Sequence, residues 1–309
     1  MPHLMIFAFQ MVKRVGLLLA VLALPLMARA TSTIDATNKY GWGANTGWTN
    51  WLPSAADGVV VGEFICSGNI YAANVGWINM GEGSPLNHIQ YQNNSATDFG
   101  VNYSIDPTQP GVGILRGYAY GANIGWINFE AQGNPRISLF TGNFTGYAYS
   151  ANCGWINLND ALGYVQTDHI AMGVDTNGNG IADAWEYLYF GNLLNNLVPA
   201  RDASSDPFGT GMTLLQDYLD GVNPTLRNSA LHITAYSTNP GGTNSSITWT
   251  STVARLYTIE TSLDLTTWGN DTTFSYPIAP NAGTSTSRSV TAAMATKRFY
   301  RVKSVRPLL

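Results

Sequence analysis

Charged side chains are scarce in this chain of 309 residues. Lys, Arg, Asp and Glu together make up 11% of the sequence, and 15 basic against 19 acidic residues leave a formal net charge of -4. A protein that binds nucleic acid usually presents a concentrated basic surface to the phosphates. The composition therefore argues against a nucleic-acid partner.

Cysteine and histidine are also scarce, with two and four residues respectively. The sequence has no metalloprotease, nucleophile-elbow, phosphate-loop or dinucleotide-binding motif. Few residues are therefore candidates for a catalytic role. His169 follows Asp168, but two adjacent residues do not make a catalytic triad. Cys66 and Cys153 are able to pair in an exported chain, and we favour one disulfide over two buried thiols.

A single apolar run, residues 15–27, lies near the N-terminus. Lys13 and Arg14 precede it, and Ala28-Arg29-Ala30 follows as a cleavage pattern, so residues 1–30 are predicted to be a signal peptide cut after Ala30. No later stretch reaches the roughly 18 apolar residues of a membrane-spanning helix, and we expect no transmembrane segment in the mature chain. Loss of the three basic residues changes the formal charge from -4 to -7. We expect a secreted or cell-surface protein.

The strongest chemical pattern in the chain is the twelve-residue segment 175–186. It places side-chain oxygens at positions 1, 3, 5 and 9, a glycine for the sharp turn at position 6, a carbonyl at position 7 and an acid at position 12. These are the ligand positions of an EF-hand calcium loop. The predicted cofactor is Ca²⁺, and its predicted ligands are Asp175, Asn177, Asn179, Ile181, Asp183 and Glu186.

The alternative is that 175–186 is an ordinary Asx- and Gly-rich turn that begins a helix. We favour the calcium site because all the spaced positions are filled together. Three acids and two neutral amides predict weak binding, with a Kd on the order of 10⁻⁴ to 10⁻³ M, as in extracellular modules. Such a site is filled outside a cell.

One aromatic motif, Ala-Asn-x-Gly-Trp-x-Asn, occurs four times between residues 31 and 165. The tryptophans are spaced by 29, 49 and 29 residues, which indicates a duplicated unit of two motifs. Each copy joins a short alternating stretch to a Gly-containing turn and a second short stretch, which predicts a β-hairpin. We expect the first Asn of each copy to form a turn. The four tryptophans are Trp48, Trp77, Trp126 and Trp155.

These repeated tryptophans have two interpretations. The one we favour places each in an equivalent core position, as repeated aromatic residues usually are in duplicated units. The alternative is a glycan platform, because Trp and Tyr rings stack on sugar rings. In that case the partners would be extracellular glycans or cell-surface components.

A degraded second copy of the calcium loop follows at residues 206–217. It keeps Asp206, a glycine at position 6 and Asp217, but Phe208 and Leu214 replace two oxygen ligands, so we expect it to bind calcium poorly or not at all. Helices are predicted after both loops, ending at Gly191 and Gly221. We expect these two helices to pack on each other.

The segment from Asp175 to Pro224 resembles the paired EF-hand-like or thrombospondin type 3-like calcium segment of exported bacterial proteins. The resemblance covers about 50 residues and rests on 175–187, Phe190-Gly191-Asn192-Leu193, and 206–224 with its Tyr218-Leu219-Asp220-Gly221 end. Residues 256–268, with Phe299-Tyr300-Arg301-Val302, resemble a C-terminal module that often follows this pair. The resemblance implies calcium binding and export, without a defined catalysis.

These patterns together predict a mainly β protein with four parts. They are the signal peptide (1–30), a duplicated antiparallel β-repeat domain (31–165), a short helical calcium-binding segment (166–228) and a C-terminal β-sandwich (229–309). The favoured function is an exported, non-enzymatic calcium-binding protein in which calcium orders the inter-domain segment. The alternatives are a carbohydrate-binding protein that uses the repeat aromatics and, third, a polysaccharide-active enzyme.

Overall fold

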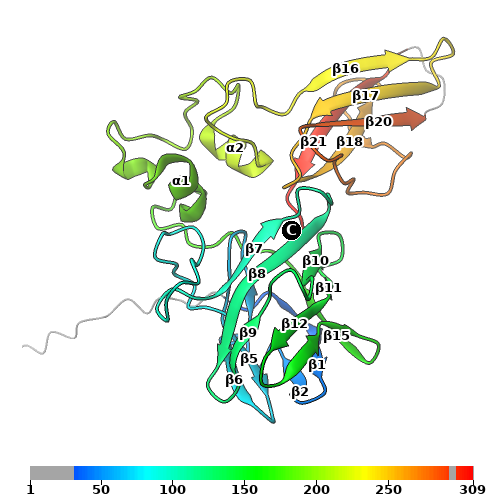
Figure 1. Cartoon of the computed structure of the whole chain (residues 1–309). Helices are drawn as coiled ribbons and strands as arrows, with labels where there is room; N and C mark the ends of the chain where they lie inside the picture. Colours follow the sequence, from blue (N-terminus) through cyan, green and yellow to red (C-terminus); the bar gives the residue numbers. More distant parts are fainter. Residues whose placement is uncertain (1–30, 292–296, 309) are drawn as a thin grey trace, which may run out of the picture.

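The fold is mainly β, with antiparallel sheets and two short α-helices (Figure 1). The computed structural model describes residues 31–291 and 297–308, so the predicted signal peptide, residues 1–30, lies outside the described residues. In Figure 1 the N-terminal strands occupy the lower half, the two helices lie above them, and the C-terminal strands form a separate group at the upper right. None of the helices in the described ranges is long and apolar enough to cross a membrane.

The four motif copies form four β-hairpins that close into one eight-stranded antiparallel barrel. Within each hairpin the Gly-containing turn joins two short strands, and each hairpin pairs with the next until the fourth pairs with the first. Closure leaves no open sheet edge among these strands. The hairpins are β1 (Ile34–Gly43) with β2 (Gly47–Asn50), β5 (Asn69–Ala72) with β6 (Gly76–Asn79), β8 (Val112–Gly121) with β9 (Gly125–Asn128), and β12 (Tyr147–Ser150) with β13 (Gly154–Asn157).

Shorter strands extend the barrel at one end. The long strand β8 pairs with β7 and β10 beyond its barrel partners, and β1 pairs with β15. These strands surround a single buried apolar cluster that continues from the barrel interior. The additional strands are β3 (Val60–Val61), β4 (Cys66–Ser67), β7 (Val101–Ile105), β10 (Arg136–Ser138), β11 (Phe144–Thr145), β14 (Asn159–Asp160) and β15 (Gly163–Thr167).

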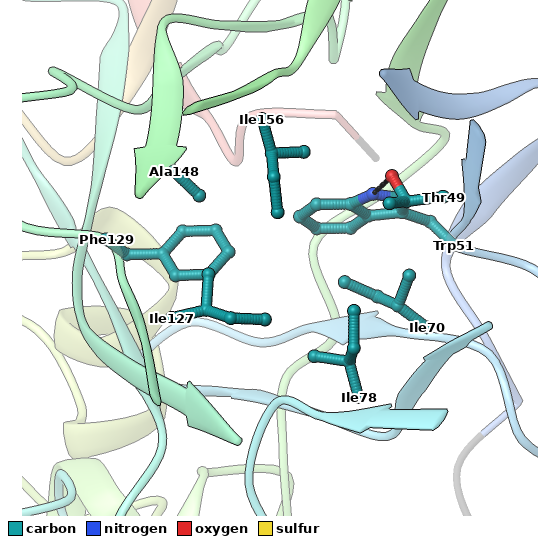
Figure 2. Close-up of a pocket in the computed structure, with 8 residues that line it drawn as sticks. All are labelled: Thr49, Trp51, Ile70, Ile78, Ile127, Phe129, Ala148 and Ile156. Atoms are coloured by element: carbon teal, nitrogen blue, oxygen red, sulfur yellow. Dashed lines mark hydrogen bonds between the residues drawn. The ribbon is translucent and has the colours of Figure 1, made fainter. Parts of the chain in front are cut away.

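The barrel interior is filled by side chains. Figure 2 shows Trp51 and Phe129 among the isoleucines that line its centre, where the remaining cavity measures only about 10 Å³. A cavity must offer about that much space to hold a single water molecule. The interior is therefore a packed core, as is usual for eight strands, and it has no room for a ligand.

The motif asparagines link neighbouring hairpins and mark the positions where strands end. The Nδ2 groups of Asn45, Asn123 and Asn152 donate across to main-chain carbonyls in the turn of an adjacent hairpin, at 2.9 to 3.1 Å. The last Asn of every copy accepts the backbone N–H two residues further on, which turns the chain at the end of the second strand. The prediction that the first Asn acts in the turn is thus refined, because its amide also joins one turn to the next.

The repeat tryptophans lie on the outside of the barrel, so the expectation that they fill the core is wrong. Their exposed fractions are 41%, 52%, 47% and 47% in chain order. Successive side chains of a strand point to opposite faces, and the residue after each Trp is the one that faces inward. Those inward residues, all at most 4% exposed, are Thr49, Ile78, Ile127 and Ile156.

The two cysteines are free, and the predicted disulfide is absent from the structure. Cys66 lies on β4 opposite Val61, and complete burial raises the pKa of its thiol to about 12. Cys153 lies in the turn of the fourth hairpin and is 7% exposed. It occupies the same motif position as Val75 and Ile124, which are also buried, so it closes the turn end of the barrel as a small apolar residue.

The predicted helices are confirmed and pack together. Helix α1 (Asp183–Phe190) ends at Gly191 and α2 (Leu214–Asp220) ends at Gly221, both glycines having the left-handed conformation. A short 3₁₀ helix, η1 (Leu194–Asn196), follows α1. The rings of Trp185 and Tyr218 lie 5.7 Å apart in the small core between the two α-helices.

The C-terminal residues form two three-stranded antiparallel sheets around one core. One sheet contains β16 (Ile233–Thr238), β17 (Asn244–Thr250) and β20 (Ser285–Thr291), and the other contains β18 (Leu256–Ser262), β19 (Gly269–Asn270) and β21 (Phe299–Val305). Inward side chains from both sheets meet in a buried cluster that includes Trp249 and Ile259, each 0% exposed. Alternating apolar residues along these strands account for this arrangement.

Substitutions in the third hairpin test which face of the barrel is the core. We expect Ile127→Ala to lower the free energy of unfolding by about 3 kcal/mol, because it leaves a cavity in a packed interior. Trp126→Ala, next to it in the chain, is expected to cost only about 1 kcal/mol, since half of that ring is in water and its contacts are with neighbouring surface aromatics. Urea denaturation measures both values. The reverse order would contradict the outward placement of the tryptophans.

Candidate functional site

The predicted calcium loop folds around the carboxylate of Asp175. Its Oδ1 accepts the backbone N–H of Asn179 at 3.2 Å, and its Oδ2 accepts that of Gly180 at 2.9 Å. Gly178 and Gly180 both have positive φ angles, of 67° and 84°, which the tight turn requires. The loop therefore brings positions 1, 3 and 5 close together.

Glu186 approaches the loop from the first turns of α1 and is 0% exposed. Its carboxylate accepts N–H groups from the side-chain amides of Asn177, at 3.1 and 3.2 Å, and Asn179, at 2.7 Å. The backbone N–H of Leu194 lies at 3.4 Å. Burial raises the pKa of Glu186, because desolvation disfavours the charged carboxylate. A bound cation would offset that cost directly.

Asp183, which is also a predicted ligand, directs its carboxylate to Thr176. Its carboxylate accepts the backbone N–H and the hydroxyl of Thr176, at 2.8 and 2.5 Å, and so ties the start of the loop to the start of α1. Position 9 of an EF-hand loop often reaches the ion through a water molecule. Ile181 is completely buried, and its N–H donates to Oδ1 of Asn179 at 2.8 Å.

The oxygen-bearing side chains of the loop are those that a calcium-type cation would require. The backbone N–H of Asn179 joins positions 1, 3 and 5, the Asn177 and Asn179 side-chain amides join positions 3 and 5 to position 12, and all four side chains carry oxygen. Within residues 31–291 and 297–308, no three His, Cys, Asp or Glu side chains converge as a metal site. The loop would thus hold an ion with amide and carbonyl oxygens in addition to Asp175 and Glu186. That mixed set suits a weakly bound calcium ion better than a transition metal.

The second loop keeps its shape with a hydroxyl at position 5. Asp206 accepts the backbone N–H groups of Thr210 and Gly211, at 2.9 and 3.0 Å, as Asp175 does in the first loop. The Thr210 hydroxyl lies 3.1 Å from Oδ2 of Asp217. Phe208, in place of the oxygen ligand at position 3, stacks on Phe190 with centroids 6.2 Å apart. This position therefore packs the second loop against α1.

Asp217 is a buried carboxylate with an incomplete set of partners. It is 0% exposed, and its Oδ1 has no hydrogen-bond partner in the part of the chain that the structure describes. Burial raises the pKa of Asp217 to about 6, against a lowering contribution from the Thr210 hydroxyl. The charged form, which predominates at neutral pH, therefore costs more free energy in the folded chain than in water.

Residues at the C-terminal end of α2 contact both the barrel part and the C-terminal part. The Tyr218 hydroxyl donates to Oε2 of Glu63 at 2.6 Å, and Arg306 forms an ion pair with the other oxygen of Glu63. Arg255 donates to the carbonyls of Tyr218 and Leu219, each at 2.6 Å, so a guanidinium occupies the negative end of the helix. Glu63 belongs to the barrel part, and both arginines belong to the C-terminal part. These contacts connect all three parts of the structure.

Sequence patterns did not point to Glu63, Arg255 or Arg306 as a group. Glu63 and Tyr218 are 155 residues apart, and Glu63 and Arg306 are 243 apart. No local spacing relates such residues, and none of them belongs to a motif. Their role follows only from the way the three parts meet.

The outside of the barrel carries an aromatic surface. We use that term for the four repeat tryptophans and the tyrosines of their partner strands, which contact them edge to face or at a tilt with centroids 4.8 to 6.3 Å apart. Each tryptophan keeps at least 41% of its surface exposed. Edge-to-face pairing holds a ring in place while one side stays accessible. The tyrosines are Tyr40, Tyr71, Tyr120 and Tyr149.

Comparisons with protein-family models, with curated proteins and with solved structures found no match to this chain.

Two histidines have contacts that explain their placement. His88 stacks on Tyr187 with centroids 4.2 Å apart, and His232 contacts the carbonyl of Ala230 through Nδ1. The features that bear on function are the predicted calcium loop, the aromatic surface, and the contacts of α2 with Glu63, Arg255 and Arg306, which we call the joint.

Asp217 gives a pH-dependent prediction. Because its folded pKa of about 6 lies above the value of 3.8 for an unperturbed Asp, its contribution to stability is present below about pH 3.8 and is lost as the pH rises through 6. Asp217→Asn imitates the protonated form. In EDTA we expect it to raise the free energy of unfolding by about 1 to 2 kcal/mol at pH 7.5 and to change it little at pH 3.5. Thermal unfolding at the two pH values measures the difference.

Asp264→Asn is the control with the opposite sign. Backbone N–H groups of Thr267 and Thr266 lower the pKa of Asp264 to about 2, so its charged form is the stabilising one above pH 3.8. This substitution should lower the melting temperature at pH 7.5. Destabilisation of both variants at pH 7.5 would show that Asp217 is not a strained charge.

Proposed function

We propose that this is an exported, non-enzymatic calcium-binding protein of the cell surface or extracellular space, in which calcium orders the segment between two β parts. Glu186 carries the proposal. It is a fully buried carboxylate that faces the amides at positions 3 and 5 of an EF-hand-like loop. The predicted signal peptide and the weak, calcium-type ligand set support a location where calcium is abundant.

The position of the loop explains what the ion would do. Glu186 directly follows Trp185 in α1. Trp185 packs on Tyr218, and Tyr218 in turn binds Glu63. Calcium in the loop would hold the start of α1 and thereby the packing of α1 on α2. The ion would stabilise the folded chain because the unfolded chain has no such site.

We also propose the finer architecture and resemblance that go with this function. Residues 166–228 would be a paired EF-hand-like or thrombospondin type 3-like segment whose second loop binds calcium poorly or not at all, because Phe208 packs where a ligand is needed. The four hairpins would be two copies of a two-hairpin unit, as the 78-residue offsets indicate. The two C-terminal sheets would form a small β-sandwich over their shared core.

Calcium titration of the mature chain tests the site. With a Kd between about 10⁻⁴ and 10⁻³ M, about 10 mM calcium should add roughly 1.4 to 2.7 kcal/mol to the free energy of unfolding. Glu186→Gln should abolish that increment. Because burial raises the pKa of Glu186, the same substitution should leave stability in EDTA unchanged or higher, which separates loss of the ion from damage to the fold.

The matched control is Glu82→Gln, which changes an exposed Glu on the barrel. It should keep the full calcium increment. Isothermal titration calorimetry gives the stoichiometry, which we expect to be one ion. An equal calcium response in the wild type and in Glu186→Gln would remove the site.

The second candidate function is glycan binding by the aromatic surface. The observation that favours it is the exposure of the repeat tryptophans, with Trp77 the most exposed at 52%. Rings held by neighbouring tyrosines and open to solvent are suited to stacking on sugar rings, and they would meet extracellular glycans or cell-surface components. The repeated register gives four similar places around one barrel.

Glycan-array binding of the mature chain tests this candidate. Trp77→Ala should reduce binding to a recognised glycan severalfold while the melting temperature changes by only a few degrees, because the ring is half exposed. Trp268→Ala is the control, since Trp268 lies in the C-terminal part under Arg301. Equal binding by wild type and Trp77→Ala, or loss of folding in Trp77→Ala, would contradict a glycan platform at this ring.

A further inference from the structure

A cavity of about 360 Å³ lies where the three parts of the chain meet. Phe64 and Tyr103 line it from the barrel part, Trp185 and Leu188 from α1, and Arg255 and Arg306 from the C-terminal part. Its volume falls in the range of small-molecule binding sites, in contrast to the packed interior of the barrel. None of the predicted calcium ligands and no residue of the aromatic surface lines this cavity, although Trp185, at position 11 of the first loop, is part of its wall.

The cavity walls are largely apolar and aromatic. Phe64, Trp185 and Leu188 contribute rings and a branched aliphatic side chain from two different parts of the fold. Leu188 is 50% exposed, so apolar surface remains open to solvent there. A ligand with an apolar body would gain free energy by removing this surface from water.

Among the charged side chains that line the cavity, basic groups outnumber acidic ones. Two guanidinium groups, those of Arg255 and Arg306, line the cavity together with one carboxylate, that of Glu63. Arg306 pairs with Glu63. Asp220, a further carboxylate near Arg255, is not a lining residue and accepts the hydroxyl of Ser304. The lining therefore has one more positive charge than negative.

Both guanidinium groups keep unused donors. Arg255 is 7% exposed and gives three N–H groups to the main-chain carbonyls of Tyr218, Leu219 and Ala254. Arg306 donates through Nη2 to Glu63 and to the Tyr218 hydroxyl. A guanidinium has five N–H donors in a planar fork that matches a carboxylate. Arg255, unlike Arg306, forms no ion pair within the described residues, and a buried cation without such a partner is costly, which favours an anion at this place.

We propose that this cavity binds a small organic anion with an apolar body, of the chemical class of an aromatic carboxylate. The apolar walls hold the body, and the spare guanidinium donors hold the anionic group. The proposal does not depend on calcium or on glycan binding. It requires that a larger side chain at the cavity and a loss of its positive charge each weaken binding.

The probe is 8-anilinonaphthalene-1-sulfonate, which has an aromatic body and one negative charge. We expect saturable binding to the full mature chain with one site per molecule. Ala254→Phe fills the cavity from its wall and should weaken binding by about tenfold or more, since a packed site cannot admit an added ring. Ala131→Phe adds the same ring to an exposed turn and should leave the affinity unchanged.

The charge requirement is tested with a neutral probe, N-phenyl-1-naphthylamine. Arg306→Gln removes one positive charge from the lining and with it the excess of positive charge, while Glu63 keeps its hydrogen bond from the Tyr218 hydroxyl. This substitution should weaken binding of the anionic probe by about tenfold relative to binding of the neutral probe, as loss of a charged hydrogen bond predicts. Arg301→Gln removes a positive charge from β21 that is paired with Glu260 and does not line the cavity, and it should weaken binding of neither probe.

Three results would overturn the proposal. The first is unchanged affinity for the anionic probe in Ala254→Phe. The second is an equal loss of binding of both probes, or no loss of either, in Arg306→Gln, which would mean that the cavity does not recognise an anion. The third is loss of anionic-probe binding in Trp77→Ala, which would place the probe on the aromatic surface instead.

Discussion

The contacts of Tyr218 hold the architecture together. Its hydroxyl binds Glu63 of the barrel part, its ring packs on Trp185 of α1, and its carbonyl accepts from Arg255 of the C-terminal part. Arg306 lies over the same ring and pairs with the same Glu63. Ordering α2 therefore orders both neighbours. Because α2 packs on α1, and α1 begins in the first loop, an ion in that loop would act on the whole joint through short, contiguous contacts.

The barrel provides a rigid base for this joint. Four hairpins close on themselves, so the strands satisfy their backbone hydrogen bonds within one ring and leave no edge for another chain. The interior is filled by Thr49, Ile78, Ile127 and Ile156 together with Trp51 and Phe129, and the four repeat tryptophans lie on the outer face. The inner face of the barrel therefore packs as a core, whereas the aromatic rings of the outer face are exposed to solvent.

Sequence patterns predicted local structure well and long-range placement poorly. Glycines ended both helices where expected, and alternating residues marked the hairpins and the C-terminal strands. Alternation shows that Trp126 and Ile127 face opposite sides, but it does not tell which side is inside, and that depends on closure into a barrel with a narrow interior. The joint could not be predicted from sequence patterns, because Glu63 lies 243 residues from Arg306. The cysteines were misjudged because Cys153 fills a repeat position that is apolar in the second and third copies.

The central claim is that the first loop controls the joint between the barrel and the C-terminal part. Hydrogen–deuterium exchange of the mature chain, with and without calcium, tests it most directly. The account predicts that calcium slows exchange in α1, in α2 and in β21, which carries Ser304 at the joint. Protection confined to residues 175–186, or no protection at all, would contradict the claim.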